Sequence, residues 1–380
     1  MSLPRNGNLT CSPVEAIDGF FTRNGFDQSM RDACDSFAQS RFPEAKATAA
    51  ATHQGYCSYT LILSDTHILQ FRPGAFRLDL AICEQAREIF PALVPETTYV
   101  DTIVGECLGG AARGVLHVYL LERSRGITLA EFRRTARSKG DCAGEQDQML
   151  YRRRLVEDLA SFFATSYLHR RHPGESPKGQ VGETLRRRLR ILGNLPEHLR
   201  ANYVDEIHPR IESLESDAAW CLTHGDLVPG NIMVNPATGH LTGLIDWAEG
   251  EWLPFGVGLY GLEEVLGEES TKQDGGGEFE YYPEHHELRA LFWRTFLEAA
   301  IQPRRAVILS PSPSPSPSPL PLPLQSGDWL GDVRLGRQLG ILLWRGIAFD
   351  DGRLDRAVDA QKDGPELRKL EMFLGVSLTV

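Results

Sequence analysis

A short segment of the sequence, residues 222–247, constrains the fold of this chain more than any other. It contains Asp226, then Asn231 five positions later, then Asp246 fifteen positions after that. Between Asn231 and Asp246 the residues read as strand, turn and strand, which predicts a β-hairpin with its turn at residues 236–239. Such a hairpin brings Asn231 and Asp246 to neighbouring strand ends, so we expect three oxygen-bearing side chains to lie close together.

This pattern resembles that of a known group. The tripeptide His-Gly-Asp ending at Asp226, the Asn at position 231 and the Ile-Asp-Trp ending at Trp247 are similar to the motifs of the aminoglycoside phosphotransferase and choline kinase branch of the protein-kinase-like superfamily. The chain looks most like the fungal members of that branch. The resemblance runs from residue 55 to residue 374 and is specific only within residues 220–261. It implies an α+β fold with a small β-rich N-lobe and a larger helical C-lobe.

The resemblance also implies an activity. In such enzymes an Asp accepts the proton of the attacking hydroxyl, while an Asn and a second Asp bind Mg²⁺ together with the phosphates. Carried over to this chain, Asp226 is the expected base, and Asn231 and Asp246 are the expected Mg²⁺ ligands. His224 belongs to the same catalytic loop, and we expect it to brace the loop by hydrogen bonds rather than to transfer protons. The expected substrates are ATP, or another nucleoside triphosphate, and a hydroxyl group of a small molecule.

The sequence departs from the family pattern where the nucleotide would bind. The family places a Lys or Arg on the third strand and pairs it with a Glu on the next helix, but Gln70 occupies the expected position. A neutral amide cannot supply the missing charge. Arg72 lies two residues further on, on the same face of the strand, so we predict that it substitutes, with Glu84 or Glu88 as its partner.

Two further nucleotide contacts are expected in the N-terminal half. The turn at residues 54–58 would cover the phosphates, because Gly55 permits close approach and Ser58 can donate a hydrogen bond. An ordinary hairpin turn is an equally good interpretation of this segment. The strand that ends in Leu-Glu-Arg would cross toward the second lobe, where the backbone at Glu122 would meet the nucleotide base.

Changes in the pattern of apolar and polar residues along the chain predict three structural segments. Residues 1–44 are a mixed helical prelude, and residues 45–127 form a five-stranded sheet on one helix, followed by a hinge. Residues 128–380 form a helical lobe that carries the catalytic loop. Within this lobe, residues 310–324 alternate Pro with Ser and then with Leu, a pattern typical of an extended, flexible insert.

Charge and cysteine content limit the partners. The chain has 380 residues and a formal net charge of −11, which argues against nucleic acid or an anionic membrane as the main partner. No apolar run is long enough to span a membrane, and the seven scattered cysteines indicate neither a zinc site nor a disulfide framework. We therefore expect a cytoplasmic protein with a small-molecule partner. The sequence predicts no oligomeric state.

Two questions stay open at the level of sequence. Residues 263–287 hold nine carboxylates and one Lys, a density that either attracts a cationic acceptor toward the cleft or only keeps a Gly-rich loop soluble. The neutral Gln70 and the glycine-poor phosphate turn also favour a second hypothesis for function. In that hypothesis the chain is a pseudokinase-type binding or scaffold protein that keeps the cleft without turnover.

Overall fold

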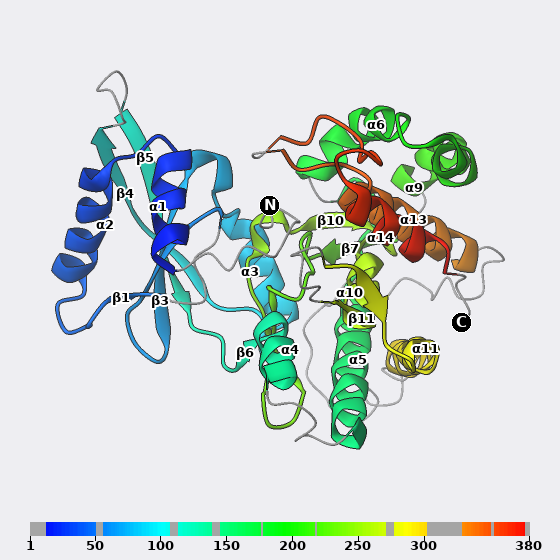
Figure 1. Cartoon of the computed structure of the whole chain (residues 1–380), viewed down its shortest axis with the longest axis horizontal. Coiled ribbons are helices and arrows are strands. Elements are labelled where there is room, and N and C mark those ends of the chain that lie inside the picture. Colours follow the sequence, from blue (N-terminus) through cyan, green and yellow to red (C-terminus); the bar gives the residue numbers. More distant parts are fainter. Residues whose placement is uncertain are drawn as a thin grey trace, which may run out of the picture.

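The described part of the computed structural model comprises residues 13–50, 56–106, 113–138, 145–175, 178–216, 219–270, 277–301, 329–350 and 353–376. In these ranges a sheet-rich N-lobe is followed by a helical C-lobe (Figure 1), which confirms the predicted α+β, protein-kinase-like fold. No helix in these ranges is long and apolar enough to cross a membrane. The predicted insert at residues 310–324 lies outside the described residues, and so does Gly55.

Five antiparallel strands form the N-lobe sheet, in the order β1-β2-β3-β5-β4. They are β1 (Thr48–Ala49), β2 (Tyr59–Ile62), β3 (His67–Pro73), β4 (Thr97–Glu106) and β5 (Arg113–Glu122). Alternation along β3 sends Leu69 and Phe71 to one face of the sheet and Gln70 and Arg72 to the other. The sequence therefore divides β3 into an apolar core face and a polar face.

Two helices cover the apolar face of the sheet, and a third connects the lobes (Figure 1). Helices α1 (Pro13–Arg23) and α2 (Gln28–Arg41) pack against Leu69 and Phe71 in a core of their own. Helix α3 (Leu80–Ile89) buries Cys83 and Ala86 in the larger core that also contains the C-lobe helices. The larger core thus continues from the N-lobe into the C-lobe through α3.

The C-lobe is built mainly from helices. Its helical segments are α4 (Leu129–Ser138), α5 (Glu145–Leu168), α6 (Gln180–Leu192), α7 (Glu197–Leu199), α8 (Asp205–Ile207), α9 (Ile211–Ser216), α10 (Tyr260–Val265), α11 (His285–Ile301), α13 (Trp329–Arg345) and α14 (Gly364–Leu374). Thr128 caps the start of α4, because its hydroxyl accepts a hydrogen bond from the Glu131 amide at 3.1 Å. Helices α5 and α11 lie together under the strands of this lobe.

Short strands carry the segment that the sequence predicts to be catalytic. Strands β6 (Ile127–Thr128), β8 (Ile232–Val234) and β9 (Leu241–Leu244) form one sheet, and β7 (Trp220–Thr223) pairs with β10 (Glu251–Pro254). A third pair consists of β11 (Gly267–Glu269) and β12 (Phe279–Tyr281). The predicted hairpin is confirmed as β8 and β9, and its turn closes through the Gly239 amide, which donates to the Asn235 carbonyl at 2.8 Å.

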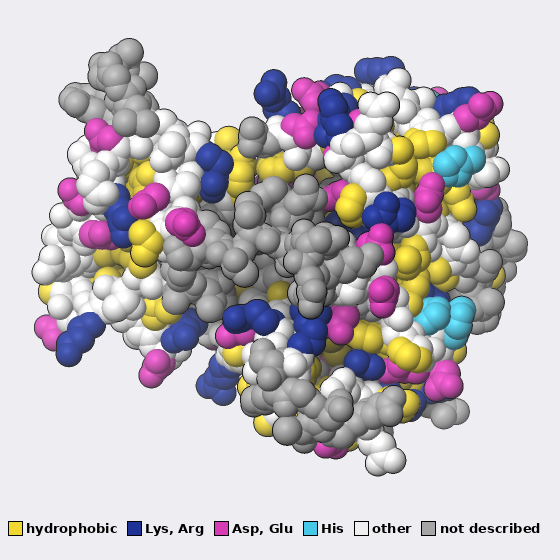
Figure 2. Space-filling view, viewed as in Figure 1, with side chains coloured by type: hydrophobic (Ala, Val, Ile, Leu, Met, Phe, Trp, Pro, Cys, Tyr) yellow, Lys and Arg dark blue, Asp and Glu magenta, His cyan; other side chains and the backbone are white. Residues whose placement is uncertain are grey.

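The acidic segment at residues 263–287 serves the C-lobe itself. Glu263 and Glu264 of α10 are buried, and each pairs with two cations from later helices. Other carboxylates of this segment pair with Arg137, Arg152 and Arg368. On the face shown in Figure 2, Lys and Arg side chains lie interspersed with Asp and Glu. These carboxylates hold helices together, a role that neither interpretation of the acidic segment included.

Candidate active site

The loop between β7 and β8 brings Asp226 and Asn231 into direct contact. The Asn231 side-chain amide donates to the Asp226 main-chain carbonyl and to Asp226 Oδ2, both at 2.9 Å. Because its NH₂ group is used in this way, Asn231 Oδ1 is the oxygen that remains available to a cation. The spacing of five residues between Asp226 and Asn231 is therefore the length of a loop that these two hydrogen bonds close.

Asp246 lies at the end of β9, next to this loop. The Ile245 amide donates to the Asn231 carbonyl at 3.0 Å, which ties the two strand ends together. Asp246 has φ 63° and ψ 67°, and it is the only non-glycine residue at positive φ in the described ranges. A left-handed conformation costs an L-residue roughly 1–2 kcal/mol, although aspartate adopts it more readily than most residues, and such residues cluster at active sites. The structure thus gathers Asp226, Asn231 and Asp246 at one end of the hairpin.

His224 links the two aspartate segments. Its Nε2 lies 2.9 Å from the Ile245 carbonyl, and its Nδ1 accepts from the Asp226 amide at 3.2 Å. Burial lowers the pKa of His224 to about 4, so the ring is neutral at physiological pH. The neutral ring donates through Nε2 and accepts through Nδ1, which matches both contacts. Both ring nitrogens are therefore used to hold backbone, as a bracing residue requires.

Arg72 reaches this site from the N-lobe. Its Nη2 pairs with Asp246 Oδ1 at 2.8 Å, its Nε donates to Gln70 Oε1 at 3.0 Å, and its Nη1 donates to the Phe76 carbonyl at 3.3 Å. Burial alone would raise the pKa of Asp246, but the Arg72 guanidinium outweighs it and holds this pKa below its usual value. Gln70 therefore orients the Arg72 guanidinium, and the ion pair between Arg72 and Asp246 joins the two lobes.

The structure corrects the predicted partner of Arg72. Among the described residues its ion-pair partner is Asp246, whereas Glu84 and Glu88 are exposed on α3. The prediction assumed that a carboxylate on the next helix faces the strand. Helix α3 instead turns the small residues Cys83 and Ala86 toward the core.

The other predicted nucleotide contacts lie in the N-lobe. Ser58 is buried just before β2, with its Oγ 3.3 Å from Thr60 Oγ1. Glu122 ends β5, where its carboxylate pairs with Arg87 at 3.1 Å and its amide donates to the Glu96 carbonyl at 2.9 Å. To donate to a nucleotide base, the Glu122 amide would have to give up its hydrogen bond to the Glu96 carbonyl.

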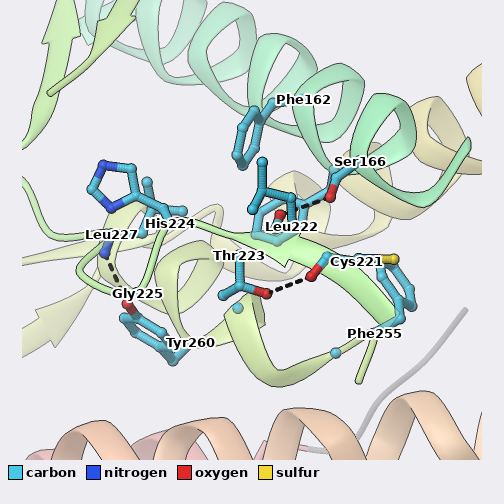
Figure 3. A pocket seen from close by; sticks show the side chains of 13 residues that line it. Phe162, Ser166, Cys221, Leu222, Thr223, His224, Gly225, Leu227, Phe255 and Tyr260 are labelled. Carbon is cyan, nitrogen blue, oxygen red and sulfur yellow. Dashed lines mark hydrogen bonds between the residues drawn. The ribbon is translucent and has the colours of Figure 1, made fainter. Parts of the chain in front are cut away.

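Two buried aromatic residues that the sequence did not single out also contact the catalytic loop. The Tyr260 hydroxyl accepts from the Leu227 amide at 2.8 Å, and the Trp344 indole donates to the Gly225 carbonyl. Figure 3 shows Leu227 and Tyr260 joined at the edge of a small cavity of about 10 Å³ behind the loop. These residues are 33 and 119 positions apart from their partners, so no local motif could reveal them.

A helical lobe whose catalytic loop and hairpin meet a cation from a five-stranded sheet defines a protein-kinase-like protein. The model of the phosphotransferase enzyme family matches residues 83–291, more than half of the chain, and the protein belongs to this family. No curated protein sequence matches the chain.

Solved structures of aminoglycoside phosphotransferases are similar to this chain at low identity. APH(3″)-Id from Streptomyces rimosus is 15% identical with a TM-score of 0.42, covering 81% of this chain and 96% of its own. The GDP and kanamycin complex of APH(2″)-IIIa is 14% identical with a TM-score of 0.44, covering 90% and 97%. The type VIII aminoglycoside-3′-phosphotransferase is 16% identical with a TM-score of 0.43, covering 82% and 97%. At this level of similarity, neither acceptor nor activity carries over.

Proposed function

We propose that the protein transfers a phosphoryl group from ATP, or another nucleoside triphosphate, to a hydroxyl group of a small molecule in a Mg²⁺-dependent reaction. The observation that carries this proposal is the meeting of Asp226, Asn231 and Asp246 at one hairpin end, with the Arg72 guanidinium 2.8 Å from Asp246. Phosphoryl transfer needs a positioned hydroxyl, a held triphosphate and a neutralised charge. The four side chains match these needs.

The donor set fits Mg²⁺. Asp246 offers carboxylate oxygens and Asn231 offers Oδ1, and Mg²⁺ prefers hard oxygen ligands while keeping water and phosphate in its shell. When bound, the cation would neutralise charge on the phosphates. Arg72 would share that task from the N-lobe, and Asp226 would hold the acceptor hydroxyl and take its proton. His224 would keep the Asp226 backbone in place.

The narrower predictions remain predictions. These are the likeness to fungal members, a cytoplasmic location, and the roles of Gly55, Ser58 and Glu122 at the nucleotide. Ion pairs inside the C-lobe already engage Glu263 and Glu264, so these two carboxylates do not support a cationic acceptor. We therefore propose the acceptor only as a small molecule with a hydroxyl group.

One observation favours the second hypothesis, a nucleotide-binding or scaffold protein without turnover. The carboxylate expected to bind the metal is already paired with Arg72, and the usual position of the cation carries Gln70. A protein in which this pair persists would hold its cleft closed to the metal. Binding and turnover must therefore be measured separately.

The first experiment measures thermal unfolding with Mg²⁺ and ATP or GTP. A nucleotide at about a hundred times its dissociation constant adds about 2.7 kcal/mol, which raises Tm by a few degrees in a chain of this length. We expect this shift in the wild type, its loss in Asp246→Asn, and its reduction in Arg72→Lys. Asp332→Asn is the matched control, because Asp332 is an exposed carboxylate that pairs with Arg210 on the C-lobe surface.

The second experiment measures turnover on pools of hydroxyl compounds. Formation of nucleoside diphosphate that depends on the pool and is lost in Asp226→Asn would support the enzyme. Nucleotide binding without product would favour the binding or scaffold protein. A folded wild type that responds to no nucleotide would overturn the enzyme and leave the scaffold protein.

A further inference from the structure

We infer that Tyr260 and Trp344 are positioning residues that fix the direction of the Asp226 side chain from behind the catalytic loop. This inference rests on the proposed function, in which Asp226 orients the acceptor hydroxyl. Tyr260 begins α10 and Trp344 lies near the end of α13, so neither belongs to the loop that it holds. Trp344 also lies outside residues 83–291, which match the family model.

The contacts act on the two peptide planes that flank the Asp226 α-carbon. The Gly225 carbonyl and the Asp226 amide belong to one plane, which accepts from the Trp344 indole on one side and donates to His224 Nδ1 on the other. The next plane carries the Leu227 amide, which donates to the Tyr260 hydroxyl at 2.8 Å (Figure 3). Because peptide groups are planar, holding both planes fixes the direction in which the Asp226 side chain leaves the backbone, and the Asn231 amide then holds Oδ2 at 2.9 Å.

The two rings form one unit. Tyr260 and Trp344 stack with centroids 4.9 Å apart and planes inclined by 12°. Tyr260 is fully buried, and Trp344 is 7% exposed. Burial raises the pKa of Tyr260 well above its usual value, so the group that accepts the hydrogen bond from the Leu227 amide stays a neutral hydroxyl. A shift of either ring would therefore move the other ring and both peptide planes.

Buried ion pairs anchor the helices that carry these rings. Glu264 of α10 pairs with Arg345, the residue after Trp344, and with Lys369 of α14 at 3.0 Å. Glu263 pairs with Arg337 of α13 at 2.9 Å. Breaking a buried pair is costly because it leaves an uncompensated charge, so α10, α13 and α14 move together or not at all.

The catalytic loop is also tightly packed at Gly225 and Leu227, the residues that Trp344 and Tyr260 contact. Gly225 has φ 81°, and a Cβ there would lie 1.9 Å from the Glu249 carbonyl oxygen. A Cβ on Gly261 of α10 would lie 2.4 Å from the Leu227 side chain. These close approaches leave the loop little room to relax if a contact is lost. Small displacements at a reacting group can cost about 100-fold in rate.

The test uses two pairs of matched variants in the full-length protein. Tyr260→Phe removes the buried hydroxyl that accepts from the loop, whereas Tyr167→Phe removes a buried hydroxyl that accepts from the Trp329 indole at 3.1 Å. Trp344→Phe removes the indole donor to Gly225, whereas Trp329→Phe, on the same helix α13, removes the indole donor to Tyr167 of α5. Each pair thus compares the loss of one hydrogen bond at the loop with the loss of one away from it.

Two measurements are made on every variant. The first is slow Mg²⁺-dependent ATP hydrolysis, with water as acceptor, resolved into kcat and KM. The second is deuterium exchange of the amides in residues 222–231, which needs no activity. We expect Tyr260→Phe and Trp344→Phe to lower kcat by roughly 10- to 100-fold with little change in KM, and to speed exchange in this segment. Tyr167→Phe and Trp329→Phe should keep both values.

The outcomes separate the inference from the function on which it rests. Equal effects of loop-facing and control variants on kcat and on exchange would overturn the positioning role and leave only packing. Unchanged exchange in both loop-facing variants would also overturn it. If the wild type neither binds nor hydrolyses nucleotide, the proposed function fails, while faster exchange in Tyr260→Phe still supports the contact itself.

Discussion

A single buried histidine makes the catalytic loop sensitive to acid. The pKa of His224 is about 4 in the folded chain because of burial, against an ordinary value of 6.5. Between these values the unfolded chain binds a proton that the folded chain does not. The free energy of unfolding therefore falls as pH drops through this range, by roughly 2–3 kcal/mol from this group alone.

His224→Gln should remove this dependence. At pH 7.5 we expect the variant to be less stable by about 1–3 kcal/mol, because the Ile245 carbonyl and the Asp226 amide lose their partner. The difference from wild type should shrink toward pH 4.5, where the wild type has lost its advantage. Urea unfolding across this range measures it. His208→Gln, at an exposed position, is the control, and an equal change in both variants would contradict the role of burial.

For single residues, the sequence predicted which side chains lie at the site better than it predicted what they contact. The bracing by His224 was predicted from a local motif, and its contact with the Asp226 amide spans 2 residues. The closing of the loop by Asn231, across 5 residues, was not predicted. The Arg72–Asp246 pair spans 174 residues and two lobes. Its formation depends on how the lobes meet, which no spacing within β3 or α3 encodes.

The N-terminus of helix α6 is capped by a carboxyl group from another element of the fold. Its N-cap residue is Gly179, which has no side chain to offer, and Glu251 of β10 accepts from the Val181 amide at 2.8 Å and the Gly182 amide at 3.4 Å. A Cβ on Gly179 would lie 2.1 Å from Glu251 Oε2. The glycine thus makes room for a cap that arrives from the strand beside the catalytic loop.

The Glu251 cap predicts a pH dependence opposite in sign to that of His224. Burial raises the pKa of Glu251 to about 7 from an ordinary 4.5, so its stabilising contribution is full below pH 4.5 and is lost as pH rises through 7. Glu251→Gln keeps an acceptor but does not titrate. From pH 4.5 to 8, its stability relative to wild type should improve by roughly 2–3 kcal/mol.

Chemical denaturation at several pH values checks this, with Glu183→Gln, exposed on the same helix, as control. A constant difference between Glu251→Gln and wild type would show that the cap does not titrate in this range. Because the His224 and Glu251 effects oppose each other, the wild-type profile alone cannot reveal either.

Elements were predictable where turn chemistry is local. The β8–β9 hairpin followed from Pro-Ala-Thr-Gly, and Gly239 takes φ 78° in the structure, a value that glycine adopts without strain. The covering of the N-lobe sheet by α1 and α2 was not predicted. Their apolar faces were visible in the sequence, but the surface that they bury is set by the sheet they meet.

Across the whole molecule, the lobes meet through an aromatic contact as well as through Arg72 and Asp246. Tyr56, within the predicted phosphate turn, lies 5.4 Å from Phe349 of the C-lobe and 6.1 Å from Phe76, measured between ring centroids. The guanidinium of Arg23 from α1 lies 4.2 Å from the centre of the Tyr56 ring. The first helix thus reaches the interface between the lobes through one side chain.

The contact between Tyr56 and Phe349 should couple the stabilities of the lobes. In a double-mutant cycle of Tyr56→Leu and Phe349→Leu, we expect a coupling energy of about 0.5–1.5 kcal/mol, as for other edge-to-face aromatic pairs. Tyr56→Leu with Phe132→Leu is the control cycle and should be additive within about 0.5 kcal/mol, because Phe132 contacts Tyr151 in the C-lobe instead. Urea unfolding gives all four stabilities of each cycle. Coupling that is no larger than in the control cycle would mean that the contact between Tyr56 and Phe349 does not join the lobes in solution.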